Sequence, residues 1–161
     1  MAKPRDSRGD AEGAEKRMGI DDITAIIIDS AMKIHMGLGP GLLESVYEAV
    51  LAKVLAQNGL DVQRQKSVSF DFEGLHFEEG FRCDLLVEGA VIVELKSVEK
   101  IAPVHQKQLL TYLRLMNLEV GLLINFGAAT LKEGLQRVVN NHIPSASPRL
   151  RVNKSSGAQQ C

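Results

Sequence analysis

The stretch from Phe81 to Lys96 contains two apolar runs joined at Glu88-Gly89, and three of its charged side chains, Asp84, Glu94 and Lys96, could share one site. Asp84 stands in its first half, and Glu94 and Lys96 stand near its end, among Ala, Val, Ile and Leu. Side chains alternate between the two faces of a strand, so Glu94 and Lys96 project from the same face. Burying these charges is costly unless they have partners, and Asp84 is the natural third member. Two carboxylates and a lysine suit a hard divalent cation, because the oxygens bind the metal and the lysine can hold or deprotonate a water beside it.

A second interpretation of the same residues is a structural ion pair at the edge of a sheet. Charges in unusual surroundings often have only a structural role, and one acid with one lysine does not distinguish the two interpretations. The motifs found elsewhere in the chain favour the metal site.

A shared site restricts the turn at Glu88-Gly89. A two-residue turn would place Asp84 and Glu94 on opposite faces of the hairpin, because directly opposed residues have a constant sum of numbers and share a face. The site therefore requires an odd-length loop or a bulge. We expect a three-residue loop at 87–89 with Gly89 in the left-handed conformation, which makes Asp84 the diagonal neighbour of Glu94.

The spacing of Asp84 and the run Glu94-Leu95-Lys96 resembles the D-x(n)-E-x-K signature of the PD-(D/E)XK nuclease superfamily. Two further motifs occur in that superfamily's order. Residues 41–47, Gly-Leu-Leu-Glu-Ser-Val-Tyr, resemble the G-x-x-E-x-x-Y motif of a small bacterial branch, and residues 108–112 are similar to the Q-x-x-x-Y element of RecB-like and lambda-exonuclease-like nucleases. The resemblance covers about residues 20–139.

The resemblance implies metal-dependent hydrolysis of phosphodiester bonds in nucleic acid, with DNA as the expected substrate. Asp84 and Glu94 would bind Mg²⁺ or Mn²⁺ together with the backbone carbonyl of Leu95, and Glu44 would contribute directly or through water. Lys96 would orient or deprotonate the attacking water and stabilise negative charge. These residues form the expected catalytic and metal-binding set.

The same resemblance assigns substrate contacts to Gln108, Tyr112 and Tyr47. Arg82, two residues before Asp84, is a further candidate for a phosphate contact. Without the family motifs, Gln108 and Tyr112 would be interpreted as part of a solvated helix face. A glutamate at position 44 would then be explained by the helix dipole, which favours acids in the first turn.

A function from another class is a non-catalytic module that binds nucleic acid or protein on a nuclease-like fold, since a fold does not determine a function. The net charge of −1 and the 4% aromatic content favour this alternative. The set of two acids and a lysine disfavours it, because a scaffold gains nothing from unpaired charges in a sheet. Assembly into a homo-oligomer is left open.

The elements that must position the candidate residues follow from apolar periodicity and turn residues. We expect helices at about 21–37, 40–58, 104–116 and 131–139, and strands at 62–72, 75–87, 90–97 and 119–126. The second helix is expected to bury a stripe formed by Val46, Val50 and Val54 together with Leu43, Leu51 and Leu55. The first three strands form an antiparallel meander, and the resulting α/β fold, a mixed sheet flanked by helices, is similar to the restriction-endonuclease-like core.

Length and composition bound the organisation of the chain. The 161 residues, 45% of them hydrophobic, are enough for one globular domain, expected at 20–143. Residues 1–19 are expected to be a disordered leader and residues 144–161 a flexible basic tail. The two cysteines, the lack of a signal-like start and the lack of a run of ~20 apolar residues predict a cytoplasmic protein without a membrane segment.

Overall fold

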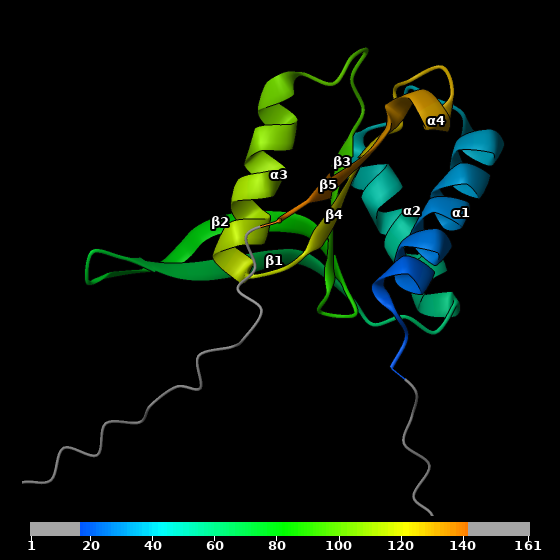
Figure 1. The fold of residues 1–161 in the computed structure, drawn as a ribbon. Coiled ribbons are helices and arrows are strands. Elements are labelled where there is room, and N and C mark those ends of the chain that lie inside the picture. Colours follow the sequence, from blue (N-terminus) through cyan, green and yellow to red (C-terminus); the bar gives the residue numbers. More distant parts are fainter. Residues whose placement is uncertain (1–16, 142–161) are drawn as a thin grey trace, which may run out of the picture.

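The computed structural model describes residues 17–141 of the chain. The expected leader lies almost wholly outside the described residues, and the expected basic tail lies wholly outside them. In chain order the elements are α1 (Ile20–Leu38), α2 (Glu44–Gln57), β1 (Val62–Phe72), β2 (Leu75–Val87), β3 (Val91–Lys96), α3 (Pro103–Met116), β4 (Val120–Asn125), α4 (Leu131–Gly134) and β5 (Leu135–Val139) (Figure 1).

The five strands form one mixed sheet in the order β1-β2-β3-β4-β5. β1, β2 and β3 are antiparallel neighbours, which confirms the predicted meander. β3 and β4 are parallel, and α3 makes the crossover connection that a parallel pair requires. β5 returns antiparallel to β4. The α/β fold is the mixed, helix-flanked sheet that the sequence predicts.

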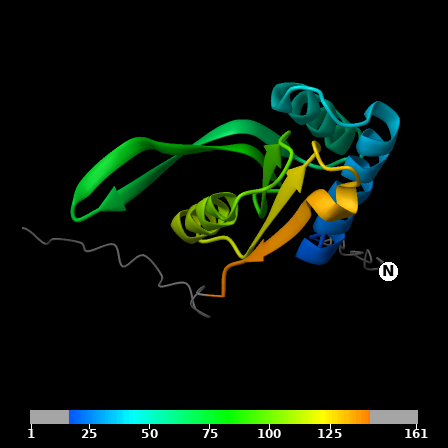
Figure 2. The same ribbon diagram turned by 90° about the horizontal axis from the view of Figure 1, so that it is seen from above.

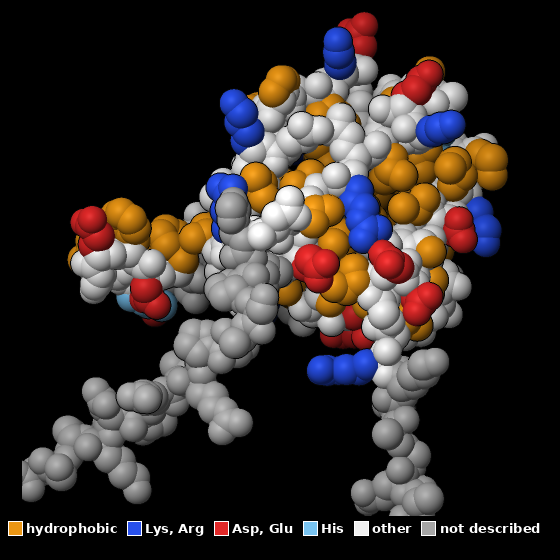
Figure 3. All heavy atoms as spheres, in the orientation of Figure 1, with side chains coloured by type: hydrophobic (Ala, Val, Ile, Leu, Met, Phe, Trp, Pro, Cys, Tyr) orange, Lys and Arg blue, Asp and Glu red, His pale blue; other side chains and the backbone are white. Residues whose placement is uncertain are grey.

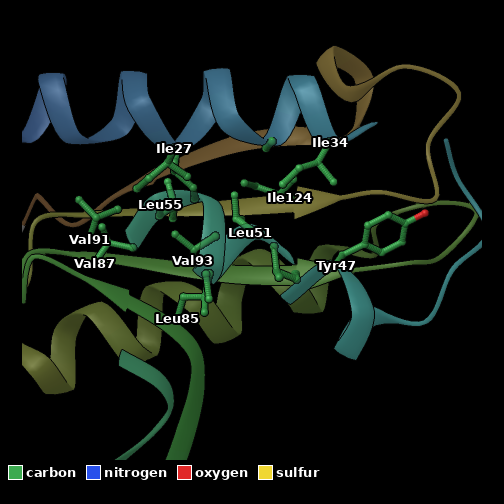
Figure 4. Packing of buried hydrophobic residues seen from close by; sticks show 14 of the residues in the cluster. Ile27, Ile34, Tyr47, Leu51, Leu55, Leu85, Val87, Val91, Val93 and Ile124 are labelled. Atoms are coloured by element: carbon green, nitrogen blue, oxygen red, sulfur yellow. The ribbon is translucent and has the colours of Figure 1, made fainter. Parts of the chain in front are cut away.

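The sheet is covered on both faces, so the core consists of two clusters. On one face, α1 and α2 pack residues such as Ile27, Leu51 and Leu55 against Val87 and Val93 (Figure 4). On the other face, a smaller cluster forms where Leu109 and Leu113 of α3 pack against the sheet residues Cys83, Leu86, Ile92 and Leu123. Every residue of β4 is buried, as expected for a strand inside a sheet with helices on both sides.

The predicted helix at 131–139 is wrong. Only Leu131–Gly134 forms a helical turn, and Leu135–Val139 is strand β5. Gly134 packs so closely on β4 that an added Cβ would lie 2.3 Å from the carbonyl oxygen of Asn125. The next five residues then pair with β4, whose backbone groups on that side would otherwise lack partners.

The second helix begins later than predicted, and the face that it buries matches the predicted stripe only in part. It starts at Glu44, because Gly39 and Gly41 adopt φ angles of +73° and +103° and turn the chain before the helix begins. The face that it buries consists of Tyr47, Glu48, Leu51, Ala52 and Leu55, whereas Val46 is 39% exposed. Of the predicted stripe, Leu51 and Leu55 are buried, Val50 and Val54 are partly buried against the core, and Leu43 and Val46 are exposed.

β1 and β2 continue far beyond the rest of the sheet. Figures 1 and 2 show them projecting away from the helices as a two-stranded ribbon, and we call its outer part, residues 68–81, the arm. β2 pairs with β3 only through residues 85–87, whereas its pairing with β1 extends from Val87 to Leu75. None of the helices among the described residues is long and apolar enough to cross a membrane.

Candidate active site

The hairpin between β2 and β3 brings the two predicted carboxylates together. Val87 pairs with Val91, so the connecting loop is Glu88-Gly89-Ala90. The requirement for an odd-length loop is confirmed, and the predicted position of the loop is wrong by one residue. Glu88 and Gly89 have φ angles of +54° and +60°, which turn the chain in this register. The pairing of Leu85 with Val93 brings Asp84 directly opposite Glu94, instead of to the predicted diagonal position.

At Asp84 and Glu94, side-chain carboxylates accept the hydrogen bonds that main-chain carbonyls would accept in a regular pair of strands. The Asp84 N–H donates to Glu94 Oε1 at 3.2 Å, and the Leu95 N–H donates to Asp84 Oδ2 at 2.8 Å. Each carboxylate is therefore anchored by the main chain of the opposite strand. The N–H and C=O of one residue in an extended strand point toward the same neighbour, so the Leu95 carbonyl is also directed toward β2.

Glu94 is buried, and its surroundings disfavour a negative charge. Its exposed fraction is 6%. Burial raises the pKa of the Glu94 carboxyl from 4.5 to about 8, and the neighbouring Asp84 carboxylate adds to the increase. The Asp84 N–H and the Lys96 ammonium act in the opposite direction but do not offset burial. The pair therefore holds a proton or another cation at neutral pH.

Burial also raises the pKa of the Asp84 carboxyl, and the charge of Glu48 adds to this increase. The hydrogen bond from Leu95, the Lys96 ammonium and the Gln65 amide lower it in part. The charge of Glu48 thus raises the pKa of Asp84, and the charge of Asp84 raises the pKa of Glu94, so three carboxyl groups influence one another. Such crowding of carboxylates is typical of functional sites, where one charge is balanced by a ligand.

Glu48, which the motif analysis did not select, is the glutamate that α2 contributes to this cluster. Its exposed fraction is 6%. Its Oε1 accepts from Arg64 Nε at 3.0 Å, and its Oε2 accepts from Gln65 Nε2 at 2.7 Å. Gln65 Nε2 also lies 3.4 Å from Asp84 Oδ1. The Gln65 amide therefore links the helical carboxylate to the carboxylate of β2.

Gln65 has an unusual backbone conformation for a residue inside a strand. Its φ angle is +48°, a region that side chains other than glycine rarely adopt. It lies between the pairs Arg64–Leu85 and Lys66–Cys83, and so opposite Asp84. Strained backbone at such a position persists only where the surroundings hold it, and here Glu48 and Asp84 both bind its side chain.

Glu44 and Tyr47, the two residues that the 41–47 motif selected, lie away from this cluster. Glu44 is exposed at the first turn of α2, beside a hollow of about 580 Å³ that is also lined by Ser97 and Val98. Tyr47 is fully buried and stacks on Phe126 at 4.3 Å between ring centroids. Its hydroxyl donates to the Gly39 carbonyl and accepts from the Leu42 N–H, so it holds the loop before α2.

α3 brings Tyr112 to the carboxylates but leaves Gln108 in solvent. Tyr112 is partly buried and stacks on Phe81 at 4.0 Å between centroids. Burial raises the pKa of its hydroxyl, and the charges of Glu94 and Asp84 raise it further. Gln108 is exposed one turn earlier on the same helix. Of the Q-x-x-x-Y pair, Tyr112 is the residue in electrostatic contact with the site.

The remaining predicted residues lie around the carboxylate pair. Lys96 is partly buried at the end of β3, and its charge lowers the pKa of both Asp84 and Glu94. Arg82 is exposed on β2, where the arm begins. Burial raises the pKa of the Cys83 thiol to about 11, so this cysteine is a neutral core residue.

The oxygen atoms around Asp84 and Glu94 are candidate ligands for a divalent cation. Among residues 17–141, no group of three or more His, Cys, Asp or Glu side chains is arranged to hold a metal ion. The buried Glu94 carboxyl, the half-buried Asp84 carboxyl and a carbonyl directed toward them are nevertheless oxygen donors of the kind that Mg²⁺ and Mn²⁺ prefer. Asp84, Glu94 and Leu95 therefore fit such an ion as a partial set of ligands, which water or substrate oxygens would complete.

Glu48 left a signal in the sequence, whereas Gln65 did not. Glu48, Leu51 and Leu55 recur at helical spacing, so a charged residue stands within an apolar stripe. Such a residue needs a buried partner, which marks it for attention. Nothing in the run Gln63–Lys66 indicates that Gln65 takes a positive φ, because that conformation depends on contacts made by two other elements.

Comparison with known proteins gives one match. No curated protein matches the chain, and no solved structure does. A family model described as the PD-(D/E)XK nuclease superfamily matches residues 21–138, which span α1 through the penultimate residue of β5. This range contains the opposed Asp84 and Glu94, Lys96, and the helix α3 that connects the parallel strands β3 and β4. The chain therefore belongs to the PD-(D/E)XK nuclease superfamily.

Proposed function

We propose that this domain is a metal-dependent nuclease that hydrolyses phosphodiester bonds of nucleic acid, with DNA as the first substrate to test. The observation that carries the proposal is the opposed pair of half-buried Asp84 and buried Glu94 at the junction of β2 and β3, with Lys96 two residues further along. Burial raises the pKa of both carboxyl groups, and a bound cation would favour their charged forms. Membership of the superfamily supports nuclease chemistry at this position.

Asp84 and Glu94, with the Leu95 carbonyl, are the residues that would hold Mg²⁺ or Mn²⁺. Such an ion supplies Lewis acidity toward a phosphodiester and toward water. The main-chain bonds from Asp84 and Leu95 fix the carboxylates before any ligand arrives. A site that is organised in advance loses little entropy on binding and keeps its donors aligned.

Lys96 supplies the positive charge of the site. Its Nζ can donate hydrogen bonds to a water molecule or to a phosphate oxygen, and in either case it stabilises negative charge that develops during hydrolysis. The Tyr112 hydroxyl stays protonated because burial and the two carboxylates raise its pKa. It is thus a hydrogen-bond donor toward substrate, whereas Gln108 and Arg82 would contact the nucleic acid from the solvent-exposed rim.

Glu48 takes the place in this proposal that the 41–47 motif gave to Glu44. It acts on Asp84 through Gln65, whose amide binds both carboxylates. Residues that orient a metal-binding carboxylate typically change affinity or activity by about 10- to 100-fold when they are removed. Assignment to the G-x-x-E-x-x-Y branch rests on the motif alone and is part of the proposal.

The decisive experiment is a cleavage assay on single- and double-stranded DNA and RNA, with Mg²⁺, with Mn²⁺ and with EDTA. Wild type should cleave at least one substrate with metal and none with EDTA, and Lys96→Ala should lose the activity. Lys53→Ala is the matched control, because Lys53 is exposed on α2. A Lys96→Ala protein as active as wild type refutes the assignment. A wild type that binds nucleic acid but cleaves nothing supports the non-catalytic module instead.

A further inference from the structure

The arm carries an unusual concentration of aromatic residues on one face. Phe70, Phe72, Phe77 and Phe81 are four of the five phenylalanines in the chain. Phe70 pairs with Phe77 and Phe72 pairs with Leu75, and opposed residues share a face, so the side chains of Phe70, Phe72, Leu75 and Phe77 lie on the same side. The exposed fractions are 61% for Phe72, 61% for Leu75 and 42% for Phe77. An apolar face of this kind marks an interaction surface.

The charge of the arm limits what can cover that face. Residues 68–81 include four acids, Asp71, Glu73, Glu78 and Glu79, and no lysine or arginine. Phosphates bind where lysine and arginine gather, so an acidic arm disfavours nucleic acid even though its phenylalanines could stack on bases. The surface therefore suits a protein partner that combines apolar and basic side chains.

The outer face of α3 has this composition. Val104 is 62% exposed and Leu115 is 41% exposed, and Lys107 and Arg114 are exposed on the same helix. Residues 103–116 contain no Asp or Glu. Figure 3 shows hydrophobic and acidic side chains together on the projecting arm, and basic side chains over α3. The two surfaces are complementary in charge, and both offer apolar side chains.

We propose that a second copy of this chain covers the arm, with the apolar face of each arm packed on the outer face of α3 of the partner subunit. The arm adjoins α3 within one copy, where Phe81 stacks on Tyr112. A two-fold axis beside this junction therefore forms both arm-to-helix contacts at once and closes the assembly as a dimer. This inference goes beyond the proposed nuclease function and does not depend on it.

The exposed apolar surface is large enough for such a dimer. The exposed parts of Phe72, Leu75 and Phe77 amount to about 300 Å² on each arm, given the roughly 200 Å² of a large side chain. Two arms and the helical surfaces that they cover would bury about 1,200 Å², the lower end of the range for specific interfaces. The charged residues at the rim then select the partner surface and exclude like-charged alternatives.

Reversing the charges on each side tests the pairing directly. One variant carries Glu78→Lys and Glu79→Lys on the arm, and the other carries Lys107→Glu and Arg114→Glu on α3. In a homodimer, either variant sets like charges against each other, so dimerisation should weaken about tenfold or more. In an equimolar mixture both arm-to-helix contacts have opposite charges, so a dimer containing one copy of each variant should form again.

Sedimentation equilibrium of the full chain, together with mass spectrometry of the mixture, measures these outcomes. Unchanged circular dichroism and thermal unfolding of each variant show that the fold is intact. The pair Phe72→Ser and Leu75→Ser should also give monomers, whereas Met36→Ser, at a site that is 73% exposed on α1, should not change the assembly.

Three results would overturn the inference. One is a wild type that stays monomeric at every concentration reached. Another is a mixture of the charge-reversed variants that does not associate. The third is a Phe72→Ser variant that loses affinity for a single-stranded oligonucleotide while its oligomeric state is unchanged, which would assign the arm to nucleic acid.

Discussion

Replacing Glu94 by glutamine tests whether the site stores electrostatic repulsion when no cation is bound. The pKa of Glu94 is about 8 in the folded chain and 4.5 when unperturbed, because burial and Asp84 disfavour its charge. A raised pKa means that the folded state binds more protons than the unfolded state between these values. The contribution of Glu94 to the free energy of unfolding is therefore greatest below about pH 4.5 and is lost as the pH rises toward 8.

The size of the effect follows from the same shift. One pKa unit corresponds to ~1.4 kcal/mol, so the shift to about 8 corresponds to about 5 kcal/mol of unfolding free energy lost by alkaline pH. This is a large part of the roughly 5–15 kcal/mol that stabilises a typical domain. Glu94→Gln keeps the shape of the side chain but cannot ionise, so it should remove most of this pH dependence.

Urea unfolding in EDTA at several pH values between 5 and 9 measures the prediction. The free energy of unfolding of wild type should fall as the pH rises across this range. That of Glu94→Gln should change little with pH, and the remaining change should come from Asp84. Adding Mg²⁺ or Mn²⁺ at pH 8 should stabilise wild type, because the cation binds only the folded site, and should have little effect on the variant. Glu44→Gln is the matched control, since Glu44 is exposed.

Two outcomes would refute the reasoning. If wild type without metal is equally stable at pH 5 and pH 8, the carboxylates do not repel each other as the geometry implies. If the free energy of unfolding of Glu94→Gln falls between pH 5 and pH 9 as much as that of wild type, the pH dependence arises at another group.

Three further predictions concern residues around the site. Glu48→Ala should lower the steady-state cleavage rate about tenfold or more, because Gln65 then loses the partner that positions it toward Asp84. Glu44→Ala should change the same rate about twofold at most, and equal losses in the two variants would return the role to Glu44. Tyr47→Phe should lower the free energy of unfolding by ~1 kcal/mol in urea titrations through its lost loop hydrogen bonds, with cleavage by the folded protein unchanged. Gly127→Ala should cost about 1–3 kcal/mol in the same titration, because the added Cβ would lie 2.4 Å from the Val98 carbonyl oxygen; an unchanged midpoint would show that the loop after β3 can move aside.

The sequence predicted those parts of the fold that depend on local patterns. The meander, α1 and α3 follow from alternating or helical periodicity bounded by glycine and proline, and the structure confirms them. A shared site for Asp84 and Glu94 required an odd-length loop by strand parity, and the structure has one. The exact loop could not be predicted, because residues 87–89 and 88–90 both satisfy parity, and the observed positive φ of Glu88 as well as Gly89 decides between them.

The missed features depend on contacts between distant elements. Glu48 is buried on α2 beside Leu51 and Leu55, where Arg64 and Gln65 of β1 bind its carboxylate, whereas Val46 of the predicted stripe is exposed. Strand β5 replaces a predicted helix because β4 offers it an unpaired edge. In both places the local pattern is consistent with more than one structure, and tertiary packing selects one.

The site and the arm have a common structural origin. β2 pairs with β3 only up to Leu85, because at Asp84 the carboxylates take over the main-chain partners that a continuing ladder would use. The residues of β2 before Asp84 are left with β1 as their strand partner, so the two strands leave the sheet together. A two-stranded ribbon cannot bury both of its faces, and the phenylalanines of the arm are consequently exposed. The departure of β2 that opens the carboxylate site thus also creates the surface that we assign to the second copy.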